Sequence, residues 1–438
     1  MRGLESARQW LRSRPSPEAD LPPAVRRRIA QAFGQELTVE QVVERVLADV
    51  RRDGDAAVAR YNALLDGVPE GVPLAVAPQE VEAAYAQVEP ELVEALRLVR
   101  ERVEAYHRRQ LEHSQRPFQA DGCGQVVRPL ERAGIYAPGT AVVYPSTVLM
   151  IAVPAMVAGV RELVMCTPAR PDGSVAPVKL VAAHLAGVRR IYRAGGVQGI
   201  AALAYGTESI PRVDKICGPG NVFVAAAKRR LFGEVGIDGL FGPSETVIVA
   251  DASADPSLVA ADLLAGAEHD ELATCVLIAT DEALAQAALY EVEGRLGSLA
   301  RRDVARAALE GRGLVVVVDD LEEGLELANE LAPEHLCLHL PDAPVWLERV
   351  RHAGCVFLGP MTAESLGDYA AGPSHVLPTG GSARFSSPLG VWDFLKVTAY
   401  VGLSAEEAAR LGPAAARVAR AEGLTGHALA IEARYLRS

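Results

Sequence analysis

Short β-branched runs alternate with alanine- and leucine-rich stretches from about residue 126 onward, and this alternation constrains the fold more than any other feature. Seven runs have the length and composition of buried strands: ELVMCTPA, RIYRAGG, DKICGP, TVIVAD, TCVLIATD, LVVVVDD and GCVFLG. Stretches such as APVKLVAAHLAGV and PSLVAADLLAGAEHDE lie between them and are long enough for helices. Such alternation predicts α/β architecture, with parallel sheets covered by helices. A chain of 438 residues has room for two such units.

Both ends and one internal stretch depart from this alternation. Residues 1–35 are charged and arginine-rich, and we expect a helical arm there. Thr38 and Gln41 have the spacing of a capping box, which predicts a helix directly after Thr38. Residues 370–396 are rich in glycine, proline and serine and predict a long functional loop. The alanine-rich residues 404–438 predict helical structure appended to the main body.

Charge and hydropathy exclude several classes of protein. The net charge of −12 argues against nucleic-acid binding, which requires a basic face. The longest apolar stretch, residues 148–160, is too short to span a bilayer, and the first residues lack the apolar region of a signal peptide. Six scattered cysteines without a CxxC pair favour reduced thiols. We therefore expect a cytoplasmic protein without a membrane or nucleic-acid partner.

Two glycine-containing segments are candidate ligand loops. The sequence has no GxGxxG, so the usual dinucleotide fingerprint is absent. CGPGN (217–221) follows a predicted strand and opens a predicted helix, and its glycines allow a backbone to approach a ligand closely. YAPGTAVVYPSTVLM (136–150) has the same form. Each segment is either a ligand loop or an ordinary strand-to-helix turn, and the sequence leaves both interpretations open.

Several acidic and imidazole side chains are candidates for proton transfer or metal binding. In APEHL, Glu334 precedes His335, and a carboxylate beside an imidazole can share proton transfer near neutral pH. The alternative is the start of a helix with its histidine in solvent. Nitrogen and carboxylate ligands suit Zn²⁺, and distant residues can converge on one ion. Because the chain has nine histidines, spacing alone gives a zinc site little support.

Taken together, long segments in a fixed order make the chain resemble the histidinol dehydrogenase family. The segments are GIYAPGTAVVYPSTVLM, AGGVQGIAALAYGT, VDKICGPGNVFVAAAKR, GIDGLFGPSE, LLAGAEHDE, APEHL, GDYAAGPSHVLPTGGSARFSSPL and EGLTGHALA. The resemblance implies a homodimeric zinc enzyme that oxidises L-histidinol to L-histidine in two NAD-dependent steps. It also implies two Rossmann-like domains without the glycine fingerprint, and a C-terminal arm exchanged between subunits.

The resemblance also implies the boundaries of the two domains and the two arms. Residues 36–133 together with 244–385 would form the first Rossmann-like domain, with the metal and acid–base residues. Residues 134–243 would form the second, which contacts NAD. Residues 1–35 would be the N-terminal helical arm, and 386–438 the C-terminal dimerisation arm.

Site residues follow from the matching positions. The resemblance makes His335 the base for hydride transfer and Glu334 the group that activates water. The implied substrate contacts are Ser244, His335, Asp368, His375, Glu422 and His427. The implied NAD contacts are Tyr136, Gln198 and Asn221. The implied zinc ligands are His269, Asp368 and His427.

One position departs from the family pattern. The family's metal segment has glutamine three residues before the ligating histidine, where this chain has Gly266. Residues i and i+3 share a helix face, so both side chains can reach one ion, but glycine offers no ligand. Water can fill the place, Glu268 or Asp270 can rotate in, or zinc affinity is lost. If water fills it, Gly266→Gln is expected to tighten zinc retention.

The substitution leaves two rival functions open. One is a diverged member of the family that oxidises another small alcohol or diol. The other is a metal-depleted binding protein, against which the presence of Glu334, His335, Asp368 and His427 argues. A hydrolytic zinc enzyme is a poorer alternative, because it leaves Gln198 and the two α/β units unexplained.

Overall fold

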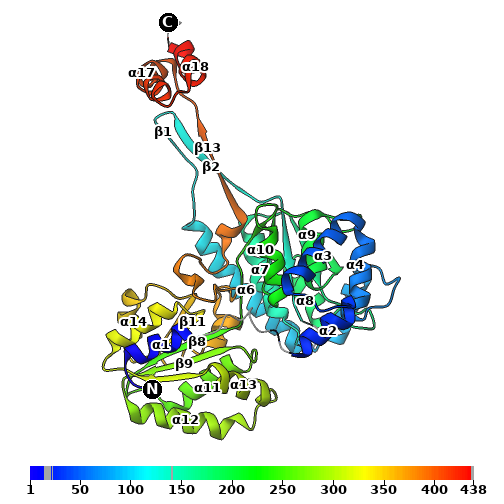
Figure 1. The fold of residues 1–438 in the computed structure, drawn as a ribbon, viewed down its shortest axis with the longest axis vertical. Coiled ribbons are helices and arrows are strands. Elements are labelled where there is room, and N and C mark those ends of the chain that lie inside the picture. The colour runs from blue at the N-terminus through cyan, green and yellow to red at the C-terminus, as the bar shows by residue number, and fades with distance from the viewer. Residues whose placement is uncertain (14–20, 22, 140–141, 436–438) are drawn as a thin grey trace.

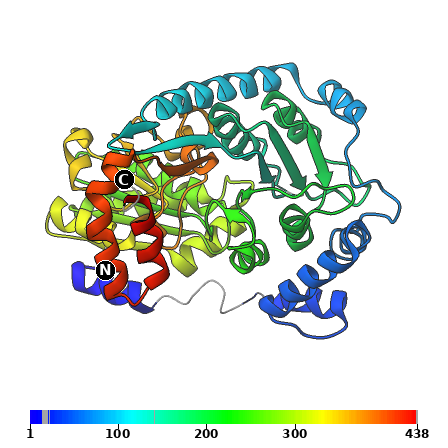
Figure 2. The same cartoon turned by 90° about the horizontal axis from the view of Figure 1, so that it is seen from above.

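The structure is a computed structural model that describes residues 1–13, 21, 23–139 and 142–435. Two bodies lie side by side, each built on a five-stranded parallel sheet, and an arm projects away from them (Figure 1). The view from above shows the same pair of bodies (Figure 2). The predicted α/β class with two parallel-sheet units is therefore confirmed. Among the described helices, none combines the length and the apolar character needed to cross a membrane.

The first sheet has the strand order β5-β4-β3-β6-β7, with every pair parallel. Its strands are β3 (Arg132–Tyr136), β4 (Glu162–Thr167), β5 (Arg190–Arg193), β6 (Lys215–Cys217) and β7 (Gly236–Ile237). Helices α7 (Pro145–Ala158) and α8 (Pro177–Leu185) cover one face, and α9 (Gly196–Tyr205) and α10 (Val222–Leu231) cover the other. Along β4, Met165 packs with the first pair and Val164 with the second, because strand side chains alternate between faces.

The second sheet repeats this topology with the order β10-β9-β8-β11-β12. Its strands are β8 (Glu245–Ala250), β9 (Thr274–Ala279), β10 (Leu314–Val317), β11 (His335–His339) and β12 (Cys355–Leu358). Helices α11 (Pro256–Ala267), α12 (Glu282–Leu296) and α13 (Arg302–Arg312) cover one face, and α14 (Leu321–Leu331) covers the other. In each sheet the first strand in the chain is central, and the order reverses between it and the fourth.

The N-terminal third of the chain packs differently from the predicted grouping. Helices α3 (Val39–Asp53), α4 (Asp55–Tyr61) and α6 (Pro90–Glu112) contribute to the two cores of the first sheet. The predicted grouping joins residues 36–133 to 244–385, but 244–385 belong to the other body. An amphipathic helix carries no mark of which sheet it will cover, so the sequence did not distinguish the two. The capping box forms as predicted, with the Thr38 hydroxyl accepting the Gln41 N–H at 3.2 Å.

The predicted N-terminal arm is divided between the two bodies. Helix α1 (Leu4–Ser13) packs on the α14 side of the second sheet, where Ala7 is buried. Helix α2 (Pro23–Phe33) instead packs with α3, through Ile29. The predicted helices are present, but they do not form one arm.

An antiparallel sheet connects the bodies to the C-terminal helices. It consists of β1 (Phe118–Ala120), β2 (Cys123–Pro129) and β13 (Leu395–Val401), in that order. Helices α17 (Ala405–Ala421) and α18 (Thr425–Tyr435) follow, and they stand at the far end of the arm (Figure 1). The appended helices agree with the prediction, whereas the hairpin of β1 and β2 was not predicted.

Candidate active site

Glu334 and His335, the predicted acid–base pair, lie at the amino edge of the second sheet, where β8 and β11 begin. The parallel register places His335 opposite Thr246. Glu334, directly before β11, accepts the backbone N–H of Glu245 at 3.1 Å. Glu334 and His335 are both buried. The solvent-facing helix start that APEHL also allowed is therefore wrong, because His335 begins β11, a buried strand paired on both sides.

Three carboxylates surround the His335 imidazole. Its Nε2 lies 3.3 Å from Asp368 Oδ1, and its Nδ1 lies 3.5 Å from Glu364 Oε1 and 3.8 Å from Glu334 Oε2. Burial alone would lower the pKa of His335, but Glu364, Glu334 and Asp368 together raise that pKa well above its usual value. Proton affinity is therefore concentrated at this imidazole.

The Glu334 carboxyl has an unusual pKa. Burial raises it to about 7, and the nearby His335 and the Glu245 N–H only partly oppose the shift. A hydrogen bond with the Ser244 side chain acts in the same direction as these two. Ser244, a predicted substrate contact, thus lies next to the acid–base pair. A carboxyl with a pKa near neutrality is suited to accept a proton from water at physiological pH.

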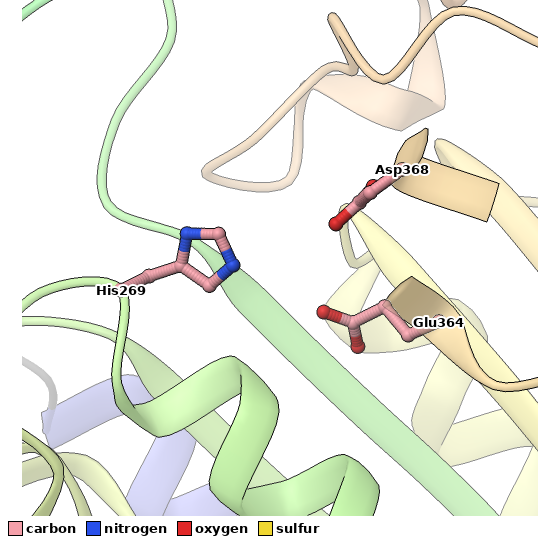
Figure 3. Close-up of side chains that lie close together, drawn as sticks. All are labelled: His269, Glu364 and Asp368. Atoms are coloured by element: carbon pink, nitrogen blue, oxygen red, sulfur yellow. The ribbon is translucent and has the colours of Figure 1, made fainter. Parts of the chain in front are cut away.

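A candidate metal group lies beside this pair. Ligand atoms of His269, Glu364 and Asp368 all lie within 4.8 Å of one another, and their side chains converge in Figure 3. His269 follows α11, Glu364 begins α16 (Glu364–Leu366), and Asp368 lies in the π-helix η4 (Gly367–Ala371). One imidazole and two carboxylates are a donor set that zinc accepts. The structure brings the predicted ligands His269 and Asp368 together, whereas Glu364 was not foreseen.

His375, a predicted substrate contact, lies directly against this group. Its Nδ1 lies 2.8 Å from the Asp368 carbonyl, and its Nε2 lies 3.0 Å from Thr147 Oγ1 on α7. It belongs to the predicted loop 370–396, which contains only short helical turns before β13. The loop therefore links the metal group to the first body.

The vacancy predicted at Gly266 does not exist as open space. A Cβ added there would lie 2.3 Å from Thr246 Oγ1 and 2.9 Å from Thr246 Cβ. Neither Glu268 nor Asp270, the two acids that could replace the missing ligand, belongs to the described metal group. The expectation that Gly266→Gln tightens zinc retention is not supported by this packing, because Thr246 occupies the room the new side chain needs.

The three predicted NAD contacts lie at the carboxyl edge of the first sheet. Tyr136 ends β3, and its hydroxyl accepts the Gly196 N–H at 2.9 Å at the start of α9. Gln198, on the same helix, is buried and donates to Asp66 at 3.2 Å. Asn221 follows β6 and caps α10. Strands β3 and β6 flank the point where the strand order reverses, which is where α/β sheets bind ligands.

A buried ion pair fixes the backbone of this edge. Lys228 on α10 pairs with Asp238, and both side chains are inaccessible to solvent. Lys228 Nζ donates to the Gly218 carbonyl at 3.0 Å, and Asp238 accepts the Gly218 N–H at 2.6 Å. The glycine segment 217–221 is thus held rigidly between strand and helix.

The remaining two predicted residues are on the arm. Glu422 caps the end of α17, and His427 lies on α18. These helices stand at the far end of the arm in Figure 1, and His427 is not part of the described metal group. Within one chain, the structure does not bring Glu422 and His427 to the site.

Comparison with known proteins identifies the family. The profile of the family described as Histidinol dehydrogenase matches residues 30–435. The chain belongs to the histidinol dehydrogenase family. The histidinol dehydrogenase of Moorella thermoacetica is 52% identical over 395 residues, which cover 90% of this chain and 93% of the relative. That of Deinococcus radiodurans is 51% identical, with 94% and 95% covered.

Structural comparison agrees with the sequence match. The crystal structure of histidinol dehydrogenase from Elizabethkingia anophelis has a TM-score of 0.87 and 35% identity. The match covers 96% of this chain and 98% of that one. The family is one of NAD-dependent oxidoreductases, so the predicted enzyme class is confirmed.

The contact between Gly266 and Thr246 predicts the effect of a single methyl group. Gly266→Ala should lower the free energy of unfolding by about 1–3 kcal/mol, because the methyl overlaps Thr246. Gly294→Ala is the matched control, since that α12 position has nothing within 4 Å of an added Cβ. The control should be up to about 1 kcal/mol more stable. Urea unfolding with a chelator present measures both, and equal stabilisation of the two variants would contradict the overlap.

Proposed function

We propose that the chain oxidises L-histidinol through L-histidinal to L-histidine, using NAD and zinc, as the last two steps of histidine biosynthesis. The observation that carries this proposal is the buried Glu334–His335 pair beside the group of His269, Glu364 and Asp368. Relatives that are 52% and 51% identical carry the name histidinol dehydrogenase. A cytoplasmic location fits this function.

In the first oxidation, His335 accepts the proton of the substrate's hydroxyl group. The carbon that bears this hydroxyl would transfer a hydride to NAD⁺. The products are the aldehyde, NADH and one proton. The position of His335 suits this role, because Asp368 and Glu364 hold its ring from two sides. A zinc ion held by His269 and Asp368 would supply positive charge that orients the substrate. The same charge would offset the carboxylates that raise the pKa of His335, so that the neutral imidazole can accept the proton.

In the second oxidation, Glu334 removes a proton from the water that adds to the aldehyde. The resulting geminal diol gives a second hydride to another NAD⁺ and becomes the carboxylic acid. Glu334 is suited to this step because its pKa of about 7 allows it to accept and release protons near neutrality. Together the steps consume one alcohol, two NAD⁺ and one water, and yield one carboxylate, two NADH and three protons.

NAD would bind at the carboxyl edge of the first sheet. Tyr136 at the end of β3, Gln198 in the first turn of α9 and Asn221 at the start of α10 lie along this edge, and the strand order reverses there between β3 and β6. Without a GxGxxG, the start of α10 and the rigid segment 217–221 take the place of the usual phosphate loop.

The substrate would be held partly by a second copy of the chain. Ser244 and His375 lie at the site of the same chain, whereas Glu422 and His427 would come from the exchanged arm of a homodimer. The arm suits such a contact because apolar side chains remain exposed along it. On β13, α17 and α18, the apolar side chains that are more than half exposed are Val401, Val418 and Leu429.

The ratio of NADH to substrate tests the function. With limiting L-histidinol and excess NAD⁺, we expect two NADH per substrate, measured by absorbance at completion. One NADH would mean that the aldehyde is not oxidised further. Absence of NADH with L-histidinol, together with turnover of another small alcohol or diol, would favour the diverged enzyme. Ligand binding without turnover of any alcohol would favour the metal-depleted binding protein.

The raised pKa of Glu334 predicts the pH dependence of the second step. With L-histidinal as substrate, kcat should fall as the pH drops through about 7, because protonated Glu334 cannot accept a proton. Glu334→Gln should lower this rate by about 10²–10⁴-fold and remove that limb of the pH profile. NAD⁺ affinity of the variant serves as the control and should not change. A limb near pH 7 that persists in Glu334→Gln would assign it to another group.

Arm exchange can be tested by complementation. His335→Asn inactivates the body of one chain, and His427→Ala inactivates the arm of another. In a mixed dimer with exchanged arms, one of the two sites has both residues intact, so co-expression should restore about a quarter of wild-type activity. Co-expressed His335→Asn and Asp368→Asn, both in the body, should stay inactive. Lack of recovery in the first pair, with mixed dimers present, would show that the arm serves its own chain.

A further inference from the structure

We propose that Glu364 is a ligand of the metal ion, in the place of the side chain that Gly266 lacks, and that Thr246 positions its carboxylate. The inference rests on the proposed zinc-dependent function and adds one ligand to it. The missing ligand is then supplied by Glu364, from another segment of the chain. Neither water, nor a rotated Glu268 or Asp270, nor a loss of zinc affinity is needed to account for Gly266.

Gly266 is explained by the neighbour that lies against it. Its backbone is helical rather than left-handed, so the conformation does not require glycine. Glycine near the end of α11 costs about 1 kcal/mol relative to alanine, and that cost needs a reason. The reason is Thr246, whose hydroxyl stands where a Cβ at Gly266 would be. Glycine at 266 and threonine at 246 therefore fit together.

The Thr246 hydroxyl connects this contact to the metal group. It donates to Glu364 Oε2 at 2.7 Å, and both side chains are buried. Thr246 is itself fixed, because it lies on the central strand β8 opposite His335 on β11. A hydrogen bond from a rigid strand to one carboxylate oxygen sets the orientation of the other, as outer partners of metal ligands commonly do.

Charge balance favours a cation at this position. Glu334, Glu364 and Asp368 are close together and largely buried. In the described parts of the chain, the ion pairs of all three carboxylates go to His335. A protonated His335 would balance only one of them, and the neutral His335 that the first oxidation requires balances none. Buried charges without a partner are strongly destabilising. A divalent ion among His269, Glu364 and Asp368 supplies the missing positive charge.

The spacing of the two acids suits joint ligation. Glu364 and Asp368 are four residues apart in the continuous turns of α16 and η4, so their side chains project from the same side. Figure 3 shows both pointing toward His269. The family pattern has a neutral glutamine amide as this ligand. The Glu364 carboxylate in its place adds one negative charge to the ligand set.

Metal binding to the full-length protein, without NAD or substrate, tests the proposal. Metal is removed with a chelator, and zinc is titrated back against a competing fluorescent chelator. Glu364→Gln should raise the zinc Kd by more than tenfold, and Thr246→Val, which keeps the volume, by about tenfold. Glu334→Gln is the matched control, because it removes the same charge from the same site outside the ligand set. Its zinc Kd should rise several-fold less than that of Glu364→Gln, because it changes the surrounding charge and removes no ligand atom.

The absorption spectrum of bound Co²⁺ separates ligation from packing. Glu364→Gln should change the ligand-field bands, whereas Glu334→Gln should reproduce the wild-type bands. If Glu364→Gln binds zinc like the wild type and leaves the Co²⁺ spectrum unchanged, the ligand assignment is wrong, while histidinol oxidation by the wild type still stands. A wild-type protein that takes up no zinc would overturn both. If Glu364→Gln fails to fold, unchanged zinc affinity in Thr246→Val overturns the proposal.

Discussion

The pairing of β8 with β11 is the contact on which the candidate site depends. Its register sets Thr246 opposite His335 and brings the Glu245 N–H to Glu334. Because side chains alternate along a strand, a shift of one residue would turn His335 to the opposite face of the sheet. The imidazole would then lose Asp368 and Glu364. The chemistry of the site is thus fixed by backbone pairing in the centre of a buried sheet.

Sequence pattern predicted the class of fold but not its assembly. All seven predicted strands exist, and their parallel pairing follows from the intervening helices. The strand β11 was missed because its apolar run is only three residues long and lies between His335 and His339, and polar residues normally argue against a buried strand. The placement of 39–112 on the first sheet was also missed, because the apolar face of a helix specifies burial and not a partner.

The candidate site was predictable where a residue carries chemistry in its immediate sequence, and not where it depends on distant packing. Glu334, His335, His269 and Asp368 were named from motifs and resemblance, and the structure brings them together. Glu364 was not named, although its four-residue spacing from Asp368 was visible. The contact between Gly266 and Thr246 joins a helix to a neighbouring strand, so no local pattern contains it. The glycine at 266 indicated only that a ligand side chain is missing. The structure shows that Thr246 occupies the space.

The two sheets contribute opposite edges to the proposed reaction. The proposed NAD contacts lie at the carboxyl ends of β3, β5 and β6, as expected for an α/β fold, whereas the proposed acid–base pair lies at the amino ends of β8 and β11. The link between these edges is a chain of contacts from Thr147, at the start of α7, through His375 to the Asp368 carbonyl. From Asp368 it continues to His335. The loop that breaks the strand–helix alternation therefore holds the edge where hydride would be accepted against the edge where protons would be transferred.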